Sequence, residues 1–529
     1  MADVRPARVR KSKWRLEFDN YMVNEGQKHI VLFIWVGIQI GYFIQSYYVL
    51  WTSPVTATFK VVLAHGLPIA RAAANLINFN CALILFTVCR NIISTIRVTT
   101  LGRYVPFDKN ITFHICIAWA IVFWSFVHCA GHFYNFFAVE LFLGGDTVTA
   151  SQINFLSGPG STGQVITVAL FLMVTSAMEA VRRKHFEIFW FTHHLFIVFF
   201  GATLMHGSFC LIKGDSGDVC RGGPSFWKWW LASALVYLAE RVLREVRGRR
   251  KTYISKVVQH PSNVCEVQFT KPSCKTKAGQ YIFISCPEIA TYEWHPFTLT
   301  SSPYEPFVSL HIRVVGDWTT AFARRLGCRF GNKEEQGMQP PSSLPFVMID
   351  GPYGSASEDV YDFEAAILVG AGIGVTPFGS ILKDLWYRVK QADGLKKLKK
   401  AYFVWVCRDK DSFEWFQDLL LTIEEENLDG FLDILTYLTA GLKPDEIKNV
   451  ILNDGDGVDA ITGLRSRTLF GRPNWDVVFK NVRDQHPGTD IGVFFCGPKA
   501  ISAALHKACN KWTDSTEVGT RFFYGKENF

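Results

Sequence analysis

Charge is missing from five long stretches of this 529-residue chain, and each stretch is mostly apolar. Residues 30–50, 72–89 and 164–178 contain no Asp, Glu, Lys or Arg, and in 111–139 and 188–212 histidine is the only basic side chain. A membrane-spanning helix needs about 20 mostly apolar residues. These five uncharged apolar stretches exclude a wholly soluble protein and predict five membrane spans.

A sixth span is expected at residues 226–242, although only eleven uncharged residues separate Lys228 from Glu240. The ends of such a helix would have to extend their charged groups to the membrane surface. After about residue 245 no stretch is long enough to span a membrane. We therefore expect a transmembrane domain at 30–245. The polar residues 1–29 before it show no cleavable signal.

Lys and Arg are nearly missing from three of the predicted links, residues 51–67, 134–163 and 208–225. The other links and both flanks hold the basic residues: Arg5, Arg8, Arg10, Lys11, Lys13, Arg15, Arg90, Arg97, Arg103, Arg182, Arg183, Lys184, Arg244, Arg247, Arg249, Arg250 and Lys251. Because basic links stay in the cytosol, we expect a multi-pass protein with both termini cytosolic, in the plasma membrane or an endomembrane (ER or vacuole). The net charge of +8 then predicts contact with anionic lipids and not with nucleic acid.

The 13 cysteines include no Cys-x-x-Cys pair, so zinc ribbons and iron–sulfur clusters have no support. The calcium-loop pattern is also missing, which argues against direct control by calcium. Only Cys210 and Cys220 fall in a predicted outside loop, where we expect a disulfide between them. Two free thiols are the alternative.

Two of the apolar stretches contain histidines, and four of these form two pairs with matched spacing: His114, His128, His193 and His206. The first two are fourteen residues apart. That spacing is about 1400° of rotation and about 21 Å of rise, so they share a helix face. The other two are thirteen residues apart, or about 20 Å of rise. Two helices with matched pairs can hold two stacked haems through neutral imidazole rings. Hydrogen bonding between helices is the alternative.

The second pair fits an ideal helix less well, because thirteen residues leave about 140° of misalignment. His194 in place of His193 leaves about 120°, which is little better. Either the helix is distorted, for example near Gly201, or the two haems sit at different azimuths. Periodicity does not choose between His193 and His194.

Arg71 and His132 are further polar residues expected near the outer membrane face. Together they can polarise a small oxidant beside the outer haem. On spacing alone, contacts with lipid headgroups and the membrane interface are the favoured explanation.

Residues 250–360 are expected to form a small antiparallel barrel that binds a flavin. Alternating segments predict strands at 253–260, 264–270, 280–285, 308–315 and 346–349. The candidate flavin contacts are His295, Pro296, Phe297, Thr298, His311 and Arg313. Arg313 suits a pyrophosphate, and His295 and Thr298 suit a flavin edge. A common Pro-aromatic turn is the alternative.

Residues 361–529 are expected to form an α/β domain that binds NADPH. An apolar strand at 365–369 leads into a glycine-rich turn and then a helix at 378–389. The turn contains Gly370, Gly372, Gly374, Thr376 and Pro377. Its glycines let the backbone approach a pyrophosphate, which the helix N-terminus attracts. Thr376 and Pro377 suit the first positions of that helix.

Three further strands are expected at 401–406, 432–437 and 491–495, and ligands bind at the C-terminal ends of such strands. Arg408 is placed to meet a 2′-phosphate, which favours NADPH over NADH, and Arg472 is expected to assist it. Cys496 is expected near the nicotinamide, with a buried structural cysteine as the alternative. Phe529, the last residue, is expected to cover a flavin ring, with a frayed tail as the alternative.

Together these motifs resemble the NADPH oxidase family, the superoxide-producing transmembrane flavocytochromes b, over nearly the whole chain. The most specific signatures are His295-Pro296-Phe297-Thr298, His311-Ile312-Arg313, Gly351-Pro352-Tyr353-Gly354, Gly370 to Phe378, Cys407-Arg408, Cys496-Gly497-Pro498 and Lys526-Glu527-Asn528-Phe529. The resemblance implies a six-helix transmembrane di-haem bundle followed by a ferredoxin–NADP reductase-like module. The length resembles phagocyte-type and fungal members.

The resemblance also assigns roles that spacing leaves open. It pairs His114 with His193 at an inner haem and His128 with His206 at an outer haem. It aligns Arg71 and His132 with the oxygen-reducing centre of the family. This reverses the interpretation from spacing alone, which favoured contacts with lipid headgroups and the membrane interface.

The implied activity moves electrons from cytosolic NADPH through FAD and two b-type haems to molecular oxygen on the opposite face, as superoxide. A ferric or other metal-chelate reductase of the same architecture is the alternative, and a non-catalytic membrane scaffold is a second one. By resemblance the expected partners are membrane lipids, a Rac-type GTPase, a cytosolic activator protein and a small membrane subunit.

Overall fold

The computed structural model describes residues 12–145, 147–209, 227–330, 343–391, 395, 397–426, 430–441, 457–516 and 518–527. Contacts divide the chain into two compact units. The helical unit is Lys28–Arg241, and the sheet unit joins Met1–Gln27 to Val242–Phe529. Cys210, Cys220 and Phe529, for which a disulfide and a flavin contact were expected, lie outside the described residues.

The helical unit contains the five expected spans as helices that are long and apolar enough to cross a membrane. They are α2 (Gln27–Thr52), α4 (Gly66–Phe86), α6 (Asn110–Leu143), α8 (Gly158–Ala177) and the interrupted pair α10 (Phe186–His193) and α11 (Phe196–His206). Shorter helices connect them: α3 (Ala57–Leu63), α5 (Arg90–Arg97), α7 (Ala150–Leu156) and α9 (Glu179–Lys184). The sixth stretch also forms a helix, α12 (Trp227–Gly248), but it is not among the five.

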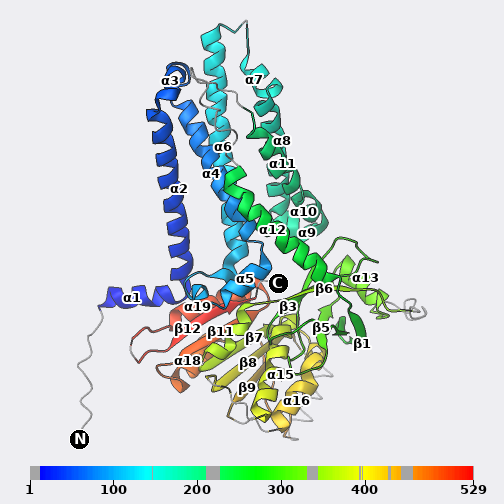
Figure 1. Ribbon diagram of the computed structural model, residues 1–529. Helices are drawn as coiled ribbons and strands as arrows, with labels where there is room; N and C mark the ends of the chain where they lie inside the picture. The colour runs from blue at the N-terminus through cyan, green and yellow to red at the C-terminus, as the bar shows by residue number, and fades with distance from the viewer. Residues whose placement is uncertain are drawn as a thin grey trace. The chain divides into compact units, whose positions relative to one another are not determined.

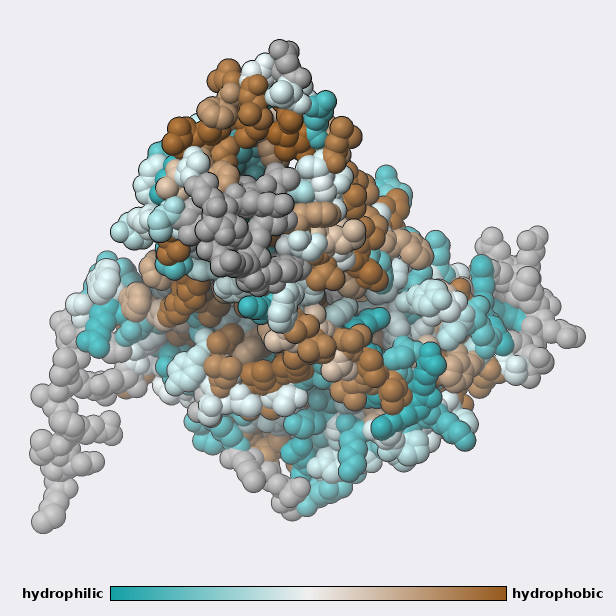
Figure 2. Space-filling model, turned by 45° about the horizontal axis from the view of Figure 1, so that its top comes forward, coloured by the Kyte–Doolittle hydropathy of each residue, from teal (hydrophilic) through white to brown (hydrophobic). Residues whose placement is uncertain are grey.

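Large apolar side chains cover the outside of these helices. Phe33 is 80% exposed, Phe126 is 72% exposed and Leu141 is 85% exposed. Figure 2 shows apolar residues gathered over the helical part of the molecule. Apolar surface on this scale marks contact with an apolar phase, as expected for helices surrounded by lipid.

Helices α4 and α6 approach each other closely because small residues face each other where they pack. A Cβ added at Gly131 on α6 would lie 3.0 Å from the Cβ of Ala70 and 3.2 Å from the carbonyl oxygen of Gly66, both on α4. Small residues at such contacts let helix backbones come together. A polar network adds to this packing, since the Gln39 side-chain oxygen accepts hydrogen bonds from Asn80 (2.9 Å) and Trp124 (2.7 Å).

The first part of the sheet unit is a pair of three-stranded antiparallel sheets around one apolar core. Their strands are β1 (Tyr253–His260), β2 (Val264–Thr270), β3 (Tyr281–Ser285), β4 (His295–Thr298), β5 (Val308–Arg313) and β6 (Met348–Tyr353), and helix α13 (Asp317–Arg325) follows β5. The strand orders are β1-β2-β5 and β4-β3-β6. The five strands expected from alternation are all present, and the His-Pro-Phe-Thr motif adds β4 because it pairs with β3.

The second part of the sheet unit is a parallel sheet of six strands in the order β10-β9-β8-β7-β11-β12. The strands are β7 (Ala365–Ala371), β8 (Lys400–Cys407), β9 (Leu432–Leu438), β10 (Leu469–Phe470), β11 (Asp490–Cys496) and β12 (Arg521–Lys526). Alternate residues of β7 enter two apolar clusters, one with α15 (Thr376–Lys390) and α16 (Gln417–Glu425), the other with α18 (Trp475–Gln485) and α19 (Lys499–Trp512). Helices therefore cover both faces of the sheet, as Figure 1 shows.

The N-terminal segment of the sheet unit packs on the edge strand β12. This segment contains α1 (Lys13–Tyr21) and a π-helical turn, Met22–Gly26. The Asn24 amide donates to the Phe522 carbonyl and accepts from the Tyr524 N–H, each at 2.9 Å. Glu25 forms an ion pair of 2.7 Å with His506 on α19.

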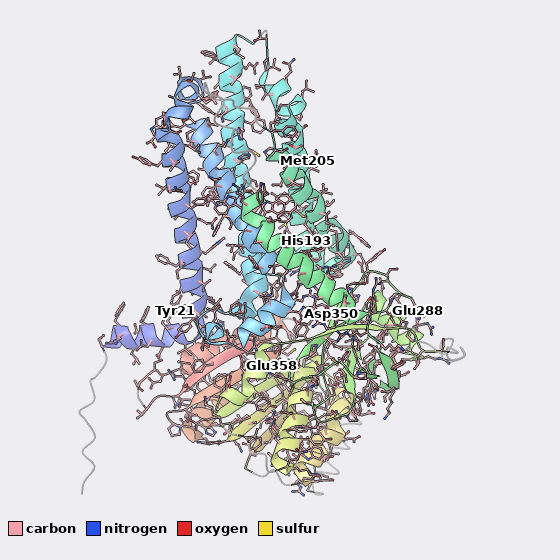
Figure 3. The ribbon with its side chains drawn as sticks, viewed as in Figure 1. Tyr21, His193, Met205, Glu288, Asp350 and Glu358 are labelled. Atoms are coloured by element: carbon pink, nitrogen blue, oxygen red, sulfur yellow. The ribbon has the colours of Figure 1, made fainter. Side chains whose placement is uncertain are left out.

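The last two turns of α12 are fixed to β6 by a buried carboxylate, Asp350, which Figure 3 labels. Asp350 is 1% exposed and forms ion pairs with Arg244 (2.9 Å) and Arg247 (2.5 Å). The Tyr353 hydroxyl donates to the same carboxylate at 2.6 Å. Burial alone would raise the pKa of Asp350, but the Tyr353 hydrogen bond and the two arginine charges outweigh it and lower the pKa.

Replacing Asp350 with Asn should destabilise the sheet unit. Two partly buried guanidinium groups would lose the Asp350 carboxylate, and breaking a buried ion pair destabilises by about 3–5 kcal/mol. Because the folded pKa is lowered, this stabilisation is present above the unfolded pKa of aspartate and is lost as the pH falls through the folded pKa. Thermal unfolding of the detergent-solubilised full chain at neutral pH measures the change. The exposed Asp362→Asn is the control, and equal unfolding temperatures for the two variants would contradict the role of Asp350.

Candidate redox centres and nucleotide site

The four histidines with matched spacing form two pairs across the helical unit. His114 and His128 lie on α6, while His193, labelled in Figure 3, ends α10 and His206 ends α11. The ring centres of His114 and His193 are 6.3 Å apart, and those of His128 and His206 are 6.1 Å apart. These are the pairs that the family resemblance implied.

Both ring separations fit two imidazoles on opposite sides of one metal ion. A metal–imidazole bond is about 2 Å long. The ring centre lies about 1.1 Å from each nitrogen, since ring bonds are about 1.3 Å. Two such ligands placed opposite each other therefore have ring centres about 6.2 Å apart. The histidines present thus suit the bis-axial ligation of two haem irons.

The other nitrogen of each ring supports this orientation. Nδ1 of His114 lies 2.8 Å from the Thr87 hydroxyl, and Nδ1 of His206 lies 3.1 Å from the Thr162 hydroxyl. Nδ1 of His128 lies 2.8 Å from the Ala70 carbonyl oxygen, a contact that the close packing of α4 and α6 permits. Metal-bound histidines usually donate their second N–H in this way, which fixes the ring. Among the described residues, the buried Nδ1 of His193 has no hydrogen-bond partner.

A break in the helix accounts for much of the misalignment between His193 and His206. The helix is interrupted at residues 194–195, not at Gly201, and the amide groups of His194, Leu195 and Ile197 bond to carbonyls three residues earlier. Such tightened turns rotate by about 120° per residue instead of about 100°. Three to five tightened residues add roughly 60–100°, which removes much of the 140° deficit.

The His194 ring contacts residues of its own helix. Its Nδ1 lies 2.7 Å from the carbonyl oxygen of Trp190, one turn earlier on the same helix. Its ring also packs against the Trp190 ring, with centres 4.9 Å apart. Geometry therefore favours His193 over His194 as the partner of His114, a choice that periodicity left open.

Arg71 and His132 lie beside the second histidine pair. The ring centres of His132 and His128 are 4.6 Å apart. Arg71, on α4, is close enough to His128, His132 and His206 to interact electrostatically with all three rings. The structure thus brings the two residues together next to one pair only, where a positive charge and a polar ring can meet a small ligand.

The predicted flavin contacts lie on β4 and β5. The His295 ring stacks on Trp318 with centres 4.1 Å apart, and its Nε2 lies 3.1 Å from a Glu293 oxygen. Thr298 is buried at the end of β4, and Arg313 is exposed at the end of β5. Sequence reasoning missed Trp318, although an aromatic residue at the start of the helix after Arg313 was a usable signal.

His311 lies on β5, in the other three-stranded sheet from His295. Its Nδ1 lies 3.0 Å from the Thr300 hydroxyl, and its Nε2 lies 3.9 Å from a Glu266 oxygen. Its ring packs on Phe416 with centres 4.7 Å apart. Both ring nitrogens therefore face protein groups in this structure.

The glycine-rich turn follows β7 and packs against the C-terminal end of β11. Gly372 has φ of +55°, which favours glycine. A Cβ added at Gly374 would lie 2.3 Å from the carbonyl oxygen of Cys496. The strands after β7 run along the sheet in one direction and β11 lies on its other side. Ligands of open α/β sheets bind at such a switch point.

The remaining predicted nucleotide contacts also follow strand ends. Arg408 follows β8 and Arg472 follows β10, and both are exposed. Backbone hydrogen bonds of 2.9 Å connect the residue after β9, Thr439, to the end of β8 at Cys407, and the residue after β10, Gly471, to the end of β9 at Leu438. Cys496 is 9% exposed, and burial raises the pKa of its thiol far above the ordinary value, so the thiol is protonated at neutral pH.

Comparison with known proteins places three family models along the chain. Residues 72–204 match the ferric reductase like transmembrane component, 249–357 match an FAD-binding domain, and 363–510 match the ferric reductase NAD binding domain. A superoxide-generating NADPH oxidase heavy chain of Dictyostelium discoideum is 43% identical over 97% of this chain and 99% of its own length. NADPH oxidase 3 of Homo sapiens is 38% identical over 96% of this chain and 99% of its own length.

The fold and the paired histidines define a membrane oxidoreductase that joins a ferric-reductase-like helical unit to an FAD- and NADP-binding module. The chain belongs to the NADPH oxidase family.

Gly374→Ala should impair use of the dinucleotide while sparing the haems. The added methyl group would meet the Cys496 carbonyl oxygen at 2.3 Å, so the turn and the end of β11 must move apart. We expect kcat/KM for NADPH to fall at least tenfold, with haem and flavin absorbance retained. Gly37→Ala, where a Cβ meets nothing within 4 Å, is the matched control. Unchanged NADPH kinetics in Gly374→Ala would rule out this turn as part of the nucleotide site.

Proposed function

We propose that this protein oxidises NADPH on the cytosolic side of a membrane and delivers single electrons to molecular oxygen on the other side. The overall reaction is NADPH + 2 O₂ → NADP⁺ + H⁺ + 2 superoxide. The observation that carries the proposal is the two histidine pairs, each at the ring separation of a metal held from both sides, in a chain that also has a dinucleotide-binding module. Family membership supports oxygen as the acceptor.

The cofactors supply the electron chemistry. When bound, FAD takes an electron pair from NADPH and the haems carry electrons one at a time. The protein residues hold and orient these groups. His114 and His193 would ligate the inner haem iron, and His128 and His206 the outer one.

We assign four domains: the basic N-terminus 1–29, the transmembrane domain 30–245, the flavin-binding domain 250–360 and the NADPH-binding domain 361–529. The assignment rests on the change from apolar helices to alternating strands and then to a parallel sheet. We also propose that α12 is a sixth span, which places both termini in the cytosol. The basic residues in alternate links support this orientation.

The two halves of the module divide the binding of flavin and dinucleotide. His295, Pro296, Phe297 and Thr298 would line the flavin, Arg313 would pair with its pyrophosphate, and His311 would hold the strand that carries Arg313. The turn from Gly370 through Gly372 and Gly374 to Thr376 and Pro377 would bind the NADPH pyrophosphate at the N-terminus of α15. Arg408 and Arg472 would meet the 2′-phosphate.

Four further residues would lie at the two ends of the electron path: Cys496 and Phe529 at one end, and Arg71 and His132 at the other. Cys496, a protonated thiol at the end of β11, would lie against the nicotinamide, and Phe529 would cover the flavin ring. Arg71 and His132 would bind oxygen beside the outer haem, where the Arg71 charge favours the developing superoxide anion.

A metal-chelate reductase is the second candidate, because two of the matching family models describe ferric reductase components. In either case membrane lipids surround the helical unit. By family resemblance we propose a Rac-type GTPase, a cytosolic activator protein and a small membrane subunit as partners.

Purified full-length protein supplied with FAD and haem should couple NADPH oxidation to oxygen uptake. We expect two superoxide ions for each NADPH, because a two-electron donor feeds a one-electron acceptor. Dye reduction that superoxide dismutase suppresses measures the product. Ferric-chelate reduction under nitrogen with little superoxide in air would instead establish the reductase.

Substitution of single histidines tests the ligand assignment. His114→Leu should abolish the bis-histidyl absorbance of the inner haem together with oxygen reduction, because that absorbance requires both His114 and His193. His193→Leu should behave in the same way. His194→Leu is the matched control, since its ring bonds to its own helix. Loss of haem in His194→Leu with retention in His193→Leu would transfer the ligand role to His194.

A further inference from the structure

A second cluster of ligand-type side chains lies on the outer face of the sheet β1-β2-β5. His260 ends β1, Glu266 lies on β2, and His311 is the residue opposite Glu266 on β5. The possible ligand atoms of these three residues all lie within 4.8 Å of one another. A Glu266 carboxylate oxygen is 3.3 Å from Nε2 of His260 and 3.9 Å from Nε2 of His311. Two imidazoles and one carboxylate form a ligand set typical of zinc.

The spacing of the two rings indicates which geometry the cluster suits. Each ligated ring has its centre about 3.2 Å from the metal, the sum of a bond of about 2.0–2.1 Å and about 1.1 Å within the ring. Two ligands at a tetrahedral angle then have ring centres about 5.2 Å apart, and two at a right angle about 4.5 Å. The observed separation of 5.3 Å between His260 and His311 matches the tetrahedral value.

Neighbouring groups orient two of the three side chains toward a common point. The Gln268 amide donates to the other Glu266 oxygen at 2.9 Å, so the oxygen nearest the histidines faces both rings. The Thr300 hydroxyl lies 3.0 Å from Nδ1 of His311, so Nε2 faces Glu266. Metal ligands are usually held by such outer hydrogen bonds.

The chemistry of the three side chains suits a cation. His311 is buried, and His260 and Glu266 are half-buried beside it. A neutral imidazole and an ionised carboxylate are the forms that bind metal.

We propose that His260, Glu266 and His311 form a tetrahedral site for Zn²⁺, with water as the fourth ligand. Small side-chain movements would close the separations to the roughly 3.3 Å between ligand atoms of a tetrahedral zinc site. This site is separate from the paired histidines of the helical unit. The competing explanation is a hydrogen-bonded triad that binds no metal.

The position of the cluster suggests what a bound ion does. The turn that follows His260 packs on the parallel-sheet part of the unit: the Pro261 carbonyl accepts from Trp415 (3.1 Å) and Ser262 donates to Asp409 (2.9 Å). The His311 ring packs on Phe416. An ion that ties β1, β2 and β5 together would therefore stiffen the junction between this antiparallel sheet and the parallel sheet.

Zinc titration of the full-length protein tests the site. Chelator-treated protein in detergent is titrated with Zn²⁺ against a competing chromophoric chelator, and bound zinc is counted by elemental analysis. We expect a tight site with one zinc per chain that raises the unfolding temperature. His260→Gln and Glu266→Gln should each weaken binding at least tenfold and remove the thermal effect. Retained haem and flavin absorbance shows that these variants are folded.

His486→Gln is the matched control, because it removes a histidine of the same unit that hydrogen-bonds to Tyr402 at 2.8 Å and takes no part in the cluster. It should bind zinc as the unmodified protein does. The proposal fails if the unmodified protein binds no zinc in competition with the chelator. It also fails if His260→Gln and Glu266→Gln bind as tightly as His486→Gln, which would place the zinc elsewhere on the chain.

Discussion

The organisation of the helical unit depends on one constraint: burying an imidazole ring among apolar helices costs free energy, and partners for its nitrogens reduce that cost. In three of the four paired histidines a protein oxygen lies beside Nδ1, so Nε2 is left to face the opposite ring. The partner of His128 is a backbone carbonyl, which a side chain reaches only if the helices nearly touch. The small residues Gly131 and Ala70 meet that condition. The tight packing of α4 on α6 therefore determines where the His128 ring lies.

A comparable close approach organises the nucleotide end of the protein. At Gly374 the turn after β7 lies so near the Cys496 carbonyl that no side chain fits. This contact holds together two strand ends that are more than a hundred residues apart in the chain. A phosphate-binding turn and the end of β11 can then act on the same dinucleotide. In both units a glycine, which has no side chain, lets two backbone segments come close enough to bring the functional groups together.

Much of this arrangement was predictable from the sequence. Uncharged stretches predicted the five strong spans, alternation predicted β1 and β2 to the residue, and the glycine-rich turn fell where the structure has it. Periodicity failed at His193, because it assumes an unbroken helix and the chain tightens at residues 194–195. The strands β4 and β10 are too short for alternation to show. The surroundings of His311 depend on Phe416, a contact between distant segments that no local pattern reports.

The hydrogen bonds of Asn24 to β12 have a further consequence. An outermost strand exposes backbone groups that can recruit a strand from another molecule. Here a single side-chain amide occupies one N–H and one carbonyl of that strand, in the manner of one rung of a neighbouring strand. The beginning of the chain thus protects the end of its own sheet from self-association. A fragment that begins after residue 249 would lack this protection. It should aggregate more than the same fragment supplied with residues 12–27.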